Sequence, residues 1–310
     1  MAFKTSLDDV RSFLTSTSPT ILIGSAAVAL TFAYAFLRPK RDPFGPHKST
    51  LHTSKFPPDT VIFHHASSDP EHALPSASMF VVKLESYLRL TNTPYQTEKI
   101  VSRSHPPKGK IPFISYNDEI IGDSSVIINY LTTHNLTRLT NPSLVLTPHQ
   151  KALSKVIQSL VEDNLYWIQL RLRWGENFDV YARKAFFGPI PWPLHKPLSS
   201  YVQEKVIEQM QSQGVGRHTL AELLVFWQEG IQALDDLLGK QKWFIGEAPT
   251  ATDCIVFGFL YNSLVIKELA PEFRKVVIGS KPLVAFTDRF MRSYWPDLVD
   301  KVETDGLLEP

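Results

Sequence analysis

The sequence predicts an α/β domain followed by an all-α domain, with one transmembrane helix ahead of both. Three observations lead to this prediction. Short β-branched segments surround an amphipathic segment between residues 59 and 135, whereas the hydrophobic pattern between residues 147 and 300 is helical throughout. An apolar run without charges covers residues 20–37, close to the ~20 residues that cross a hydrocarbon core. The 310 residues leave room for about two domains of ordinary size.

The composition excludes several function classes. Lys and Arg number 32 against 31 Asp and Glu, so the formal net charge is +1 and no electrostatic footprint for DNA or RNA emerges. Cys254 is the single cysteine, which excludes a disulfide within the chain, a CxxC centre and a thiolate zinc site. His64 and His65 lack acidic or thiol partners at ligand spacing, so no metal site is predicted. Redox chemistry would therefore need a thiol from another molecule.

The apolar run over residues 20–37 predicts a single-pass membrane protein. Residues 1–19 form a tail ahead of it, and residues 38–58 form a Pro-rich basic linker behind it. The basic residues that follow the run are Arg38, Lys40, Arg41, Lys48 and Lys55, whereas Lys4 and Arg11 precede it. This excess places the bulk of the chain in the cytosol. The organelle stays open, with the mitochondrial outer membrane and the endoplasmic reticulum as candidates.

A cleaved secretory signal is the alternative interpretation of the same run. Ala33-Tyr34-Ala35 has the small-x-small pattern of a cleavage site, and cleavage would give a secreted or lumenal chain. Against this, Asp8 and Asp9 deprive the preceding region of net positive charge. The run is also longer than the roughly 7–15 apolar residues of a signal peptide. We therefore expect an anchor.

The elements between residues 59 and 135 are expected in a thioredoxin-like order, which is strand, helix, strand and then a hairpin with a helix behind it. The strands are predicted at Thr60–Phe63, Thr97–Val101, Lys110–Tyr116 and Glu119–Ile121, and the helices at Met79–Leu90 and Val126–Leu131. Asn117-Asp118 is a turn pair between the last two strands.

The region 147–300 is expected to be a helical domain, followed by a tail over residues 301–310. Its predicted helices are Lys151–Trp174, Val202–Met210, Leu220–Leu238, Cys254–Leu269 and Ala285–Tyr294. Thr250 and Asp253 have the spacing of a capping box, in which each side chain bonds the other residue's backbone N–H.

Several motifs between Val61 and Leu298 together resemble the glutathione S-transferase superfamily, and more closely its failed-axon-connections branch, a relative of the metaxins. They are Ser78–Arg89, Gly109–Ile114, Asp123-Ser124, Leu160–Trp167, Gly214–Arg217, Thr250–Asp253 and Tyr294–Pro296. The resemblance implies a membrane-anchored protein that binds glutathione as co-substrate and conjugates it to, or uses it to reduce, a small apolar electrophile. It also implies a homodimer joined through the first domain.

The resemblance assigns the glutathione contacts to two motifs. Pro112 would be a cis-proline, with the backbone of Ile111 pairing with the tripeptide as an added strand. A trans edge-strand proline is the alternative. Asp123 and Ser124 would bind the γ-glutamyl group, since a helix N-terminus and a hydroxyl suit the carboxylate and Asp suits the ammonium. A plain N-cap that binds nothing is the alternative there.

Ser78 falls where the family places a Ser or Cys at the start of the first helix, so its predicted role is a hydrogen bond that favours the glutathione thiolate. A plain N-cap is the alternative, and Ser76 is a rival donor. Met79 stands where the family usually has proline, which favours a non-catalytic adaptor on a membrane surface as the second function. Glu162 and Tyr166 share a helix face and are expected to line an apolar cleft between the domains, with a solvated face as the alternative for the acid.

Overall fold

The computed structural model describes residues 49, 51–65, 75–100, 106–138, 146–188, 190, 193–266 and 270–304. The expected membrane span over residues 20–37, both predicted tails except residues 301–304, and most of the predicted linker lie outside these ranges. Within the described ranges, no helix has the length and apolar character needed to cross a bilayer.

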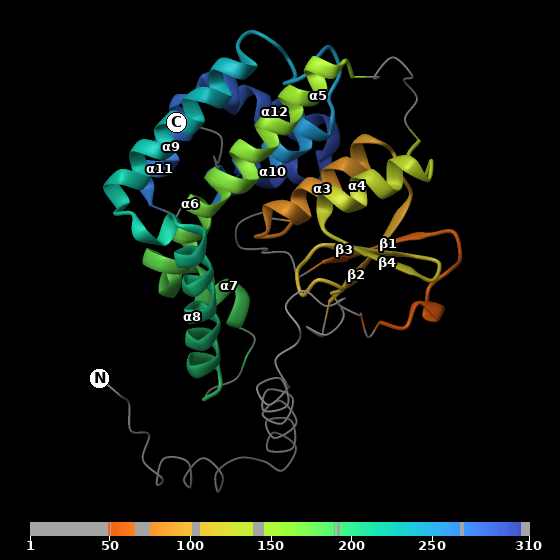
Figure 1. Ribbon diagram of the computed structural model, residues 1–310, viewed down its shortest axis with the longest axis horizontal. Coiled ribbons are helices and arrows are strands. Elements are labelled where there is room, and N and C mark those ends of the chain that lie inside the picture. Colours follow the sequence, from red (N-terminus) through yellow and green to blue (C-terminus); the bar gives the residue numbers. More distant parts are fainter. Residues whose placement is uncertain are drawn as a thin grey trace, which may run out of the picture.

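A four-stranded mixed sheet forms the first domain (Figure 1), with the strand order β2-β1-β3-β4. β1 (Val61–His65) pairs in parallel with β2 (Tyr95–Lys99) and antiparallel with β3 (Phe113–Tyr116). A tight turn then joins β3 to β4 (Glu119–Gly122) in an antiparallel hairpin. This topology confirms the thioredoxin-like order that the sequence predicts.

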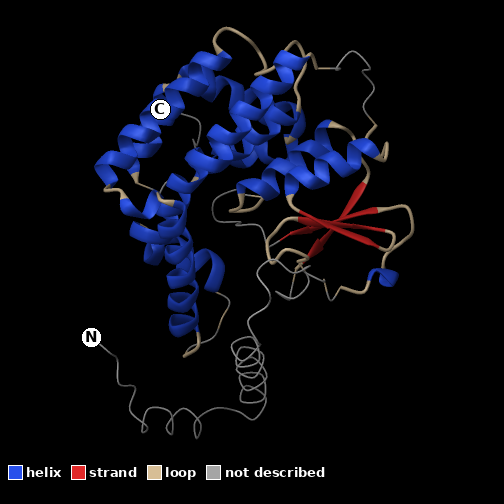
Figure 2. Cartoon of the chain, in the orientation of Figure 1, coloured by secondary structure: helices blue, strands red, loops and turns tan. Residues whose placement is uncertain are grey.

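Two helices cover the face of the sheet that is turned toward the helical domain (Figure 2). α3 (Met79–Leu90) forms the crossover between the parallel strands β1 and β2, and its bounds are those that its hydrophobic period predicts. α4 (Ser124–Thr133) follows β4 directly and packs against α3. Because the N-termini of both helices follow strands of one sheet, residues just ahead of them come together at one end of the domain.

The second domain is helical and packs on α3 and α4 (Figure 1). Its α-helices are α5 (Pro148–Ser159), α6 (Tyr166–Arg171), α7 (Arg183–Phe187), α8 (His195–Gln213), α9 (Leu220–Leu238), α10 (Ala251–Val265), α11 (Pro271–Gly279), α12 (Lys281–Tyr294) and α13 (Pro296–Thr304). Three π-helical segments, η4 (Leu160–Leu165), η5 (Leu172–Glu176) and η6 (Phe178–Ala182), lie between α5 and α7. Short 3-10 turns form η1 (Thr53–Lys55) and η7 (Val215–Arg217).

Several predicted bounds were wrong. α8 begins at His195 and α10 ends at Val265, whereas the sequence placed the start at Val202 and the end at Leu269. β2 begins at Tyr95, because its pairing with β1 starts there and not at Thr97. α11 and α13 were not predicted, since each begins with a proline, which interrupts a helix interior but fits its first turn.

The contact between α3 and α10 joins the two domains. α10 is buried from Thr252 to Val265, and the predicted capping box of Thr250 and Asp253 is present at its start. At Gly258 the two helices approach so closely that an added Cβ would lie 2.8 Å from the Met79 carbonyl oxygen. A larger residue would therefore push α3 away from α10.

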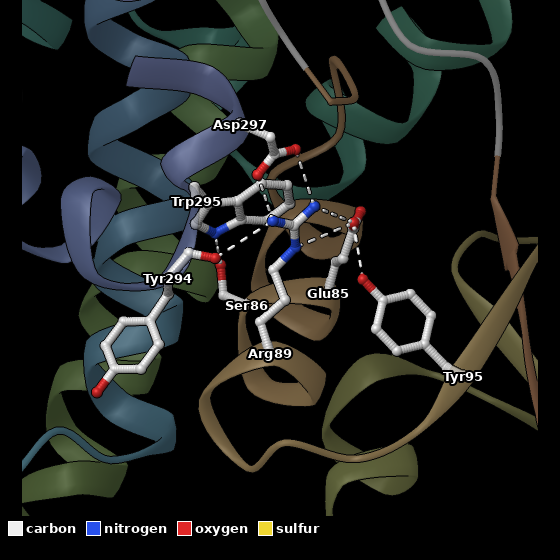
Figure 3. Close-up of polar contacts among 7 residues, drawn as sticks. All are labelled: Glu85, Ser86, Arg89, Tyr95, Tyr294, Trp295 and Asp297. Atoms are coloured by element: carbon white, nitrogen blue, oxygen red, sulfur yellow. Dashed lines mark hydrogen bonds and ion pairs between the residues drawn. The ribbon is translucent and has the colours of Figure 1, made fainter. Parts of the chain in front are cut away.

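A second connection holds the end of the helical domain on α3 (Figure 3). The Arg89 guanidinium lies 3.8 Å from the centroid of the Trp295 ring and donates to Asp297 Oδ1 over 2.6 Å. It also pairs with Glu85 at 3.1 Å, and the same carboxylate accepts a hydrogen bond from the Tyr95 hydroxyl. These contacts fix α3 between the sheet and the α12–α13 corner.

Candidate functional site

A cavity of about 510 Å³ opens between the two domains, within the range of small-molecule sites. Six of the residues that the sequence singles out line it, namely Ser78, Ile111, Pro112, Asp123, Ser124 and Tyr166. They come from the start of α3, the start of β3, the start of α4 and the start of α6. Four separate segments of the chain thus meet at one hollow.

Ser78 stands at the N-cap position of α3, but its side chain makes no capping hydrogen bond. Its carbonyl accepts from the N–H groups of Val81 and Val82, and its own N–H donates to Ser76 Oγ over 3.2 Å. Side-chain capping therefore does not account for the serine here. The side chain of Ser78 is half-buried, at the positive end of the helix dipole of α3.

The Ile111–Pro112 peptide bond is cis, so the trans alternative was wrong. Pro112 is buried and Ile111 is half-buried, and both line the cavity just ahead of β3. The pairing of the Ile111 backbone with a peptide ligand stays a prediction.

Asp123 does cap α4, as the alternative interpretation proposed. Its Oδ1 atom accepts from the N–H groups of Ser125 and Val126 over 2.9 and 3.1 Å. Its φ of 83° lies in the left-handed region, which non-glycine residues rarely adopt and which recurs at ligand sites. The cap does not engage the N–H of Ser124, whose side chain is buried at the cavity wall. An exposed carboxylate beside a helix N-terminus fits a ligand end that carries both an ammonium and a carboxylate.

Aromatic side chains form the wall that the helical domain contributes. Phe80 meets Tyr166 edge to face at 4.8 Å, and Trp174 stacks on Phe186 at 5.4 Å between ring centroids. Trp167 belongs to the same wall. Tyr166 and Trp167 lie on α6, Trp174 on η5 and Phe186 on α7, whereas Phe80 belongs to α3 of the first domain. π turns such as η5 are uncommon in proteins and occur often at functional sites. This part of the cavity suits an apolar ligand.

Both domains contribute basic side chains to the cavity lining. Lys108 and Lys110 line it from the loop ahead of β3, and Arg173 lines it from η5. Arg173 is only 4% exposed and donates to the carbonyl of Ala77. Burial raises the pKa of the Tyr166 hydroxyl, and the positive charge of Arg173 lowers it in part. The hydroxyl is thus protonated at neutral pH and can donate a hydrogen bond.

Arg173 was not among the residues predicted from the sequence to line the cavity. Its signal was the spacing of Tyr166, Leu170 and Arg173, which follows the i, i+4, i+7 rule for one helix face. A basic residue on a face that is otherwise apolar and aromatic is typical of a ligand-facing position rather than of a solvated one.

Glu162 is not among the residues that line the cavity, in contrast to its prediction. Its carboxylate is instead bound within the protein, where Oε1 accepts from Lys83 over 2.6 Å and Oε2 accepts from Gln158 over 2.8 Å. Lys83 is 1% exposed, and such a buried ammonium requires a carboxylate partner. Glu162 therefore forms a structural ion pair with α3 and does not line the cleft.

Cys254 takes no part in the cavity. It is fully buried in α10, and burial raises the pKa of its thiol well above the ordinary value. No cluster of three or more His, Cys, Asp or Glu side chains able to hold a metal occurs in the described part of the chain.

Comparison with known proteins identifies the family. Residues 79–180 match the model of the glutathione S-transferase N-terminal domain, and residues 227–290 match that of the glutathione S-transferase C-terminal domain. The chain belongs to the glutathione S-transferase superfamily, in the branch of the metaxins and failed axon connections. It is 29% identical to human metaxin-2 over 235 residues, which cover 73% of this chain and 86% of the relative.

Two further relatives support the branch. Failed axon connections of Drosophila melanogaster is 25% identical over 264 residues, 81% of this chain and 62% of the relative. Mouse metaxin-1 is 26% identical over 238 residues, 74% of each.

Solved structures support the fold. The glutathione transferases GSTFuA2 and GSTFuA3 of Phanerochaete chrysosporium superpose with TM-scores of 0.53 and 0.50, at 16% and 14% identity. Each match covers 98% of the solved chain and 76% or 77% of this one.

Proposed function

We propose that this protein is a membrane-anchored, glutathione-transferase-like protein that binds glutathione and conjugates it to a small apolar electrophile or reduces that electrophile. The observation that carries the proposal is the cavity between the domains, in which Ser78, Asp123 and Ser124 face an aromatic wall. Polar groups for a zwitterionic peptide on one side and rings for an apolar molecule on the other fit two ligands held side by side.

The γ-glutamyl group, the cysteinyl backbone and the sulfur of glutathione each have a partner in this proposal. Asp123 takes the ammonium of the γ-glutamyl group, and Ser124 at the α4 N-terminus takes its carboxylate. The backbone of Ile111, ahead of Pro112, pairs with the cysteinyl unit of the tripeptide. Ser78 then lies at the sulfur, where its hydroxyl and the α3 dipole favour the thiolate.

The chemistry follows from that placement. In conjugation, the thiolate forms a bond to an electrophilic carbon while a leaving group departs or a double bond is protonated. In reduction, the thiolate first bonds to the electrophilic atom, and the thiolate of a second glutathione then attacks the sulfur of this adduct. The bond between that sulfur and the substrate breaks, glutathione disulfide leaves, and the substrate keeps the electron pair and takes up protons from solvent. Because Cys254 is buried, the chain supplies no thiol of its own.

The membrane anchor of this proposal is the apolar run over residues 20–37, with the domains in the cytosol. Anchoring would hold the cavity near a bilayer, where apolar electrophiles concentrate. A homodimer through the first domain belongs to the same proposal, and the organelle stays open between the mitochondrial outer membrane and the endoplasmic reticulum.

A second candidate function is a non-catalytic adaptor on a membrane surface. The relationship to metaxins and failed axon connections favours it, as does Met79, which is buried at the start of α3 where catalytic relatives usually have proline. An adaptor would keep the fold and lose turnover.

Turnover by the full-length chain in detergent distinguishes the two functions. With glutathione and a generic aromatic electrophile, the transferase proposal predicts turnover that Ser78→Ala removes. Ser293→Ala is the matched control, since Ser293 is exposed on α12 and donates to the carbonyl of Arg289. Absence of turnover in the unchanged chain, together with co-purification of a membrane-bound partner protein, would contradict the transferase proposal and favour the adaptor.

A further inference from the structure

Arg173 links the helical domain to the segment that carries Ser78. Its Nη1 atom donates to the carbonyl of Ala77, the residue directly before Ser78. Its guanidinium lies 5.8 Å from the centroid of the Tyr181 ring, and the side chain is 4% exposed. The segment ahead of α3 is therefore fixed from across the cavity, by a residue of the other domain.

The same side chain supplies positive charge to the cavity at that position. Arg173 itself lines the cavity, and its contact with Ala77 brings the guanidinium beside the N-terminus of α3. The helix dipole and the guanidinium have the same sign there, so both favour an anion. The other ionisable groups that line the cavity are Lys108, Lys110, Asp123 and Tyr166.

The charges of the cavity match those of one ionisation state of glutathione. Its lining holds three cations, Lys108, Lys110 and Arg173, and one carboxylate, Asp123. Glutathione with an ionised thiol carries two carboxylates and a thiolate against one ammonium. With the thiol protonated, one cation of the cavity would lack an anionic counterpart in the ligand. Of these cations, Arg173 is the one that donates to the carbonyl of Ala77, next to Ser78.

We propose that Arg173 is a catalytic residue that holds the sulfur of bound glutathione as a thiolate at Ser78. The inference rests on the proposed binding of glutathione and adds to it the group that controls ionisation. On binding, the thiol loses its proton to solvent and the negative sulfur lies between the Ser78 hydroxyl and the guanidinium. An adjacent Arg lowers the pKa of an acid by roughly 1–3 units, so the bound thiol is expected clearly below the ~8.5 of a free cysteine thiol.

The test is a pH titration of thiolate absorbance for glutathione bound to the full-length chain, after calorimetry has established binding. Arg173→Met keeps much of the side-chain volume and removes the charge, and Arg173→Lys restores the charge without the planar fork. Arg171→Met is the matched control, because Arg171 lies two residues before Arg173 at the end of α6, pairs with Glu176 and does not line the cavity.

In the unchanged chain we expect the bound thiol to ionise below free glutathione in the same buffer. Arg173→Met should raise the thiol pKa by about 1 unit or more, which lowers the thiolate fraction at neutral pH about tenfold. Arg173→Lys should recover most of the shift, and Arg171→Met should leave it unchanged.

Two outcomes separate this inference from the proposed function. If glutathione binds to the unchanged chain but its thiol ionises as in free solution, the role of Arg173 is overturned while the binding site stays intact. This measurement uses only the unchanged chain, so it does not depend on the folding of a variant. An unchanged thiol pKa in a folded Arg173→Met protein would overturn it equally. Failure of glutathione to bind at all would instead overturn the proposed function.

Discussion

Lys83 Nζ lies 2.6 Å from Glu162 Oε1, so an ion pair connects α3 of the first domain to η4 of the helical domain. Ser125 Oγ accepts from Lys83 over 2.7 Å and from Gln158 over 2.8 Å, and Gln158 in turn donates to Glu162. The four side chains close a ring beside the N-terminus of α4. The helical domain thereby holds the α4 turn that carries Asp123.

Removing one partner of this pair should be costly. Glu162→Ala leaves the buried ammonium of Lys83 without its carboxylate, and we expect a loss of about 3–5 kcal/mol in the free energy of unfolding. Replacing both, as Lys83→Met with Glu162→Leu, should cost much less, because no buried charge remains. Denaturant unfolding measures both, with Asp288→Ala at the exposed pair with Arg292 as control, expected within about 1 kcal/mol. Equal losses in the single and double variants would contradict the ring's role.

Gly258 should not tolerate a side chain. The Cβ of Gly258→Ala would lie 2.8 Å from the Met79 carbonyl oxygen and 3.1 Å from the Lys83 nitrogen, both backbone atoms of α3. We expect a loss of about 1–3 kcal/mol in thermal or denaturant unfolding, as for other overpacked sites. Gly279→Ala at the end of α11 is the control, since nothing lies within 4 Å of its added Cβ. A Gly258→Ala protein as stable as the control would mean that α3 and α10 lie further apart than described here.

Cys254 should be unreactive in the folded protein. It is fully buried and its pKa is raised, so little thiolate forms and no reagent reaches it. We expect a thiol reagent to label it at least about tenfold more slowly than an exposed cysteine introduced as Ser293→Cys, and at a rate set by unfolding. Because the folded pKa is raised, moderate alkaline pH should not accelerate labelling. Rapid labelling under native conditions would place the thiol at the surface.

Tyr130 offers a pH test of the first domain. Burial, and then a hydrogen bond to the Glu119 carboxylate, raise the pKa of Tyr130 to about 12 from 10.0. A raised folded pKa means that this contribution to stability is fully present below pH 10.0 and is lost as the pH rises through about 12. The tyrosinate absorbance of the Tyr130→Phe variant, subtracted from that of the unchanged chain, isolates the titration of Tyr130. This titration should occur near pH 12, and Glu119→Gln should lower the pKa of Tyr130. A Tyr130 pKa of 10.0 in the unchanged chain and in the Glu119→Gln variant would contradict the hydrogen bond between the two side chains.

Local sequence patterns predicted the elements whose hydrophobic period matches the face that they bury. α3 and α9 have their predicted bounds, since an amphipathic period with clear ends determines both. Five of the six predicted residues in the cavity lining come together because strand ends and helix starts of a thioredoxin-like sheet meet at one edge, and the sixth, Tyr166, comes from α6 of the helical domain.

Features that depend on contacts between domains could not be predicted in the same way. The partner of Glu162 is a lysine 79 positions earlier in the chain, which a single helix pattern does not reveal. The sequence period places Arg173 on the helix face of Tyr166 and Leu170, but it does not reveal that this face lies against Ala77 of the other domain. α11 and α13 went undetected because proline signals both the end of one helix and the start of the next.

Binding of glutathione to the cavity through Asp123 can be measured by calorimetric titration of the full-length chain with glutathione. Asp123→Asn keeps an N-cap for α4 but removes the charge that would take the ammonium. Asp118→Asn, in the exposed β3–β4 turn, is the matched control. We expect saturable binding in the unchanged chain and the control, and at least about tenfold weaker binding in Asp123→Asn. No heat of binding at millimolar glutathione, or equal affinity in all three proteins, would contradict this expectation.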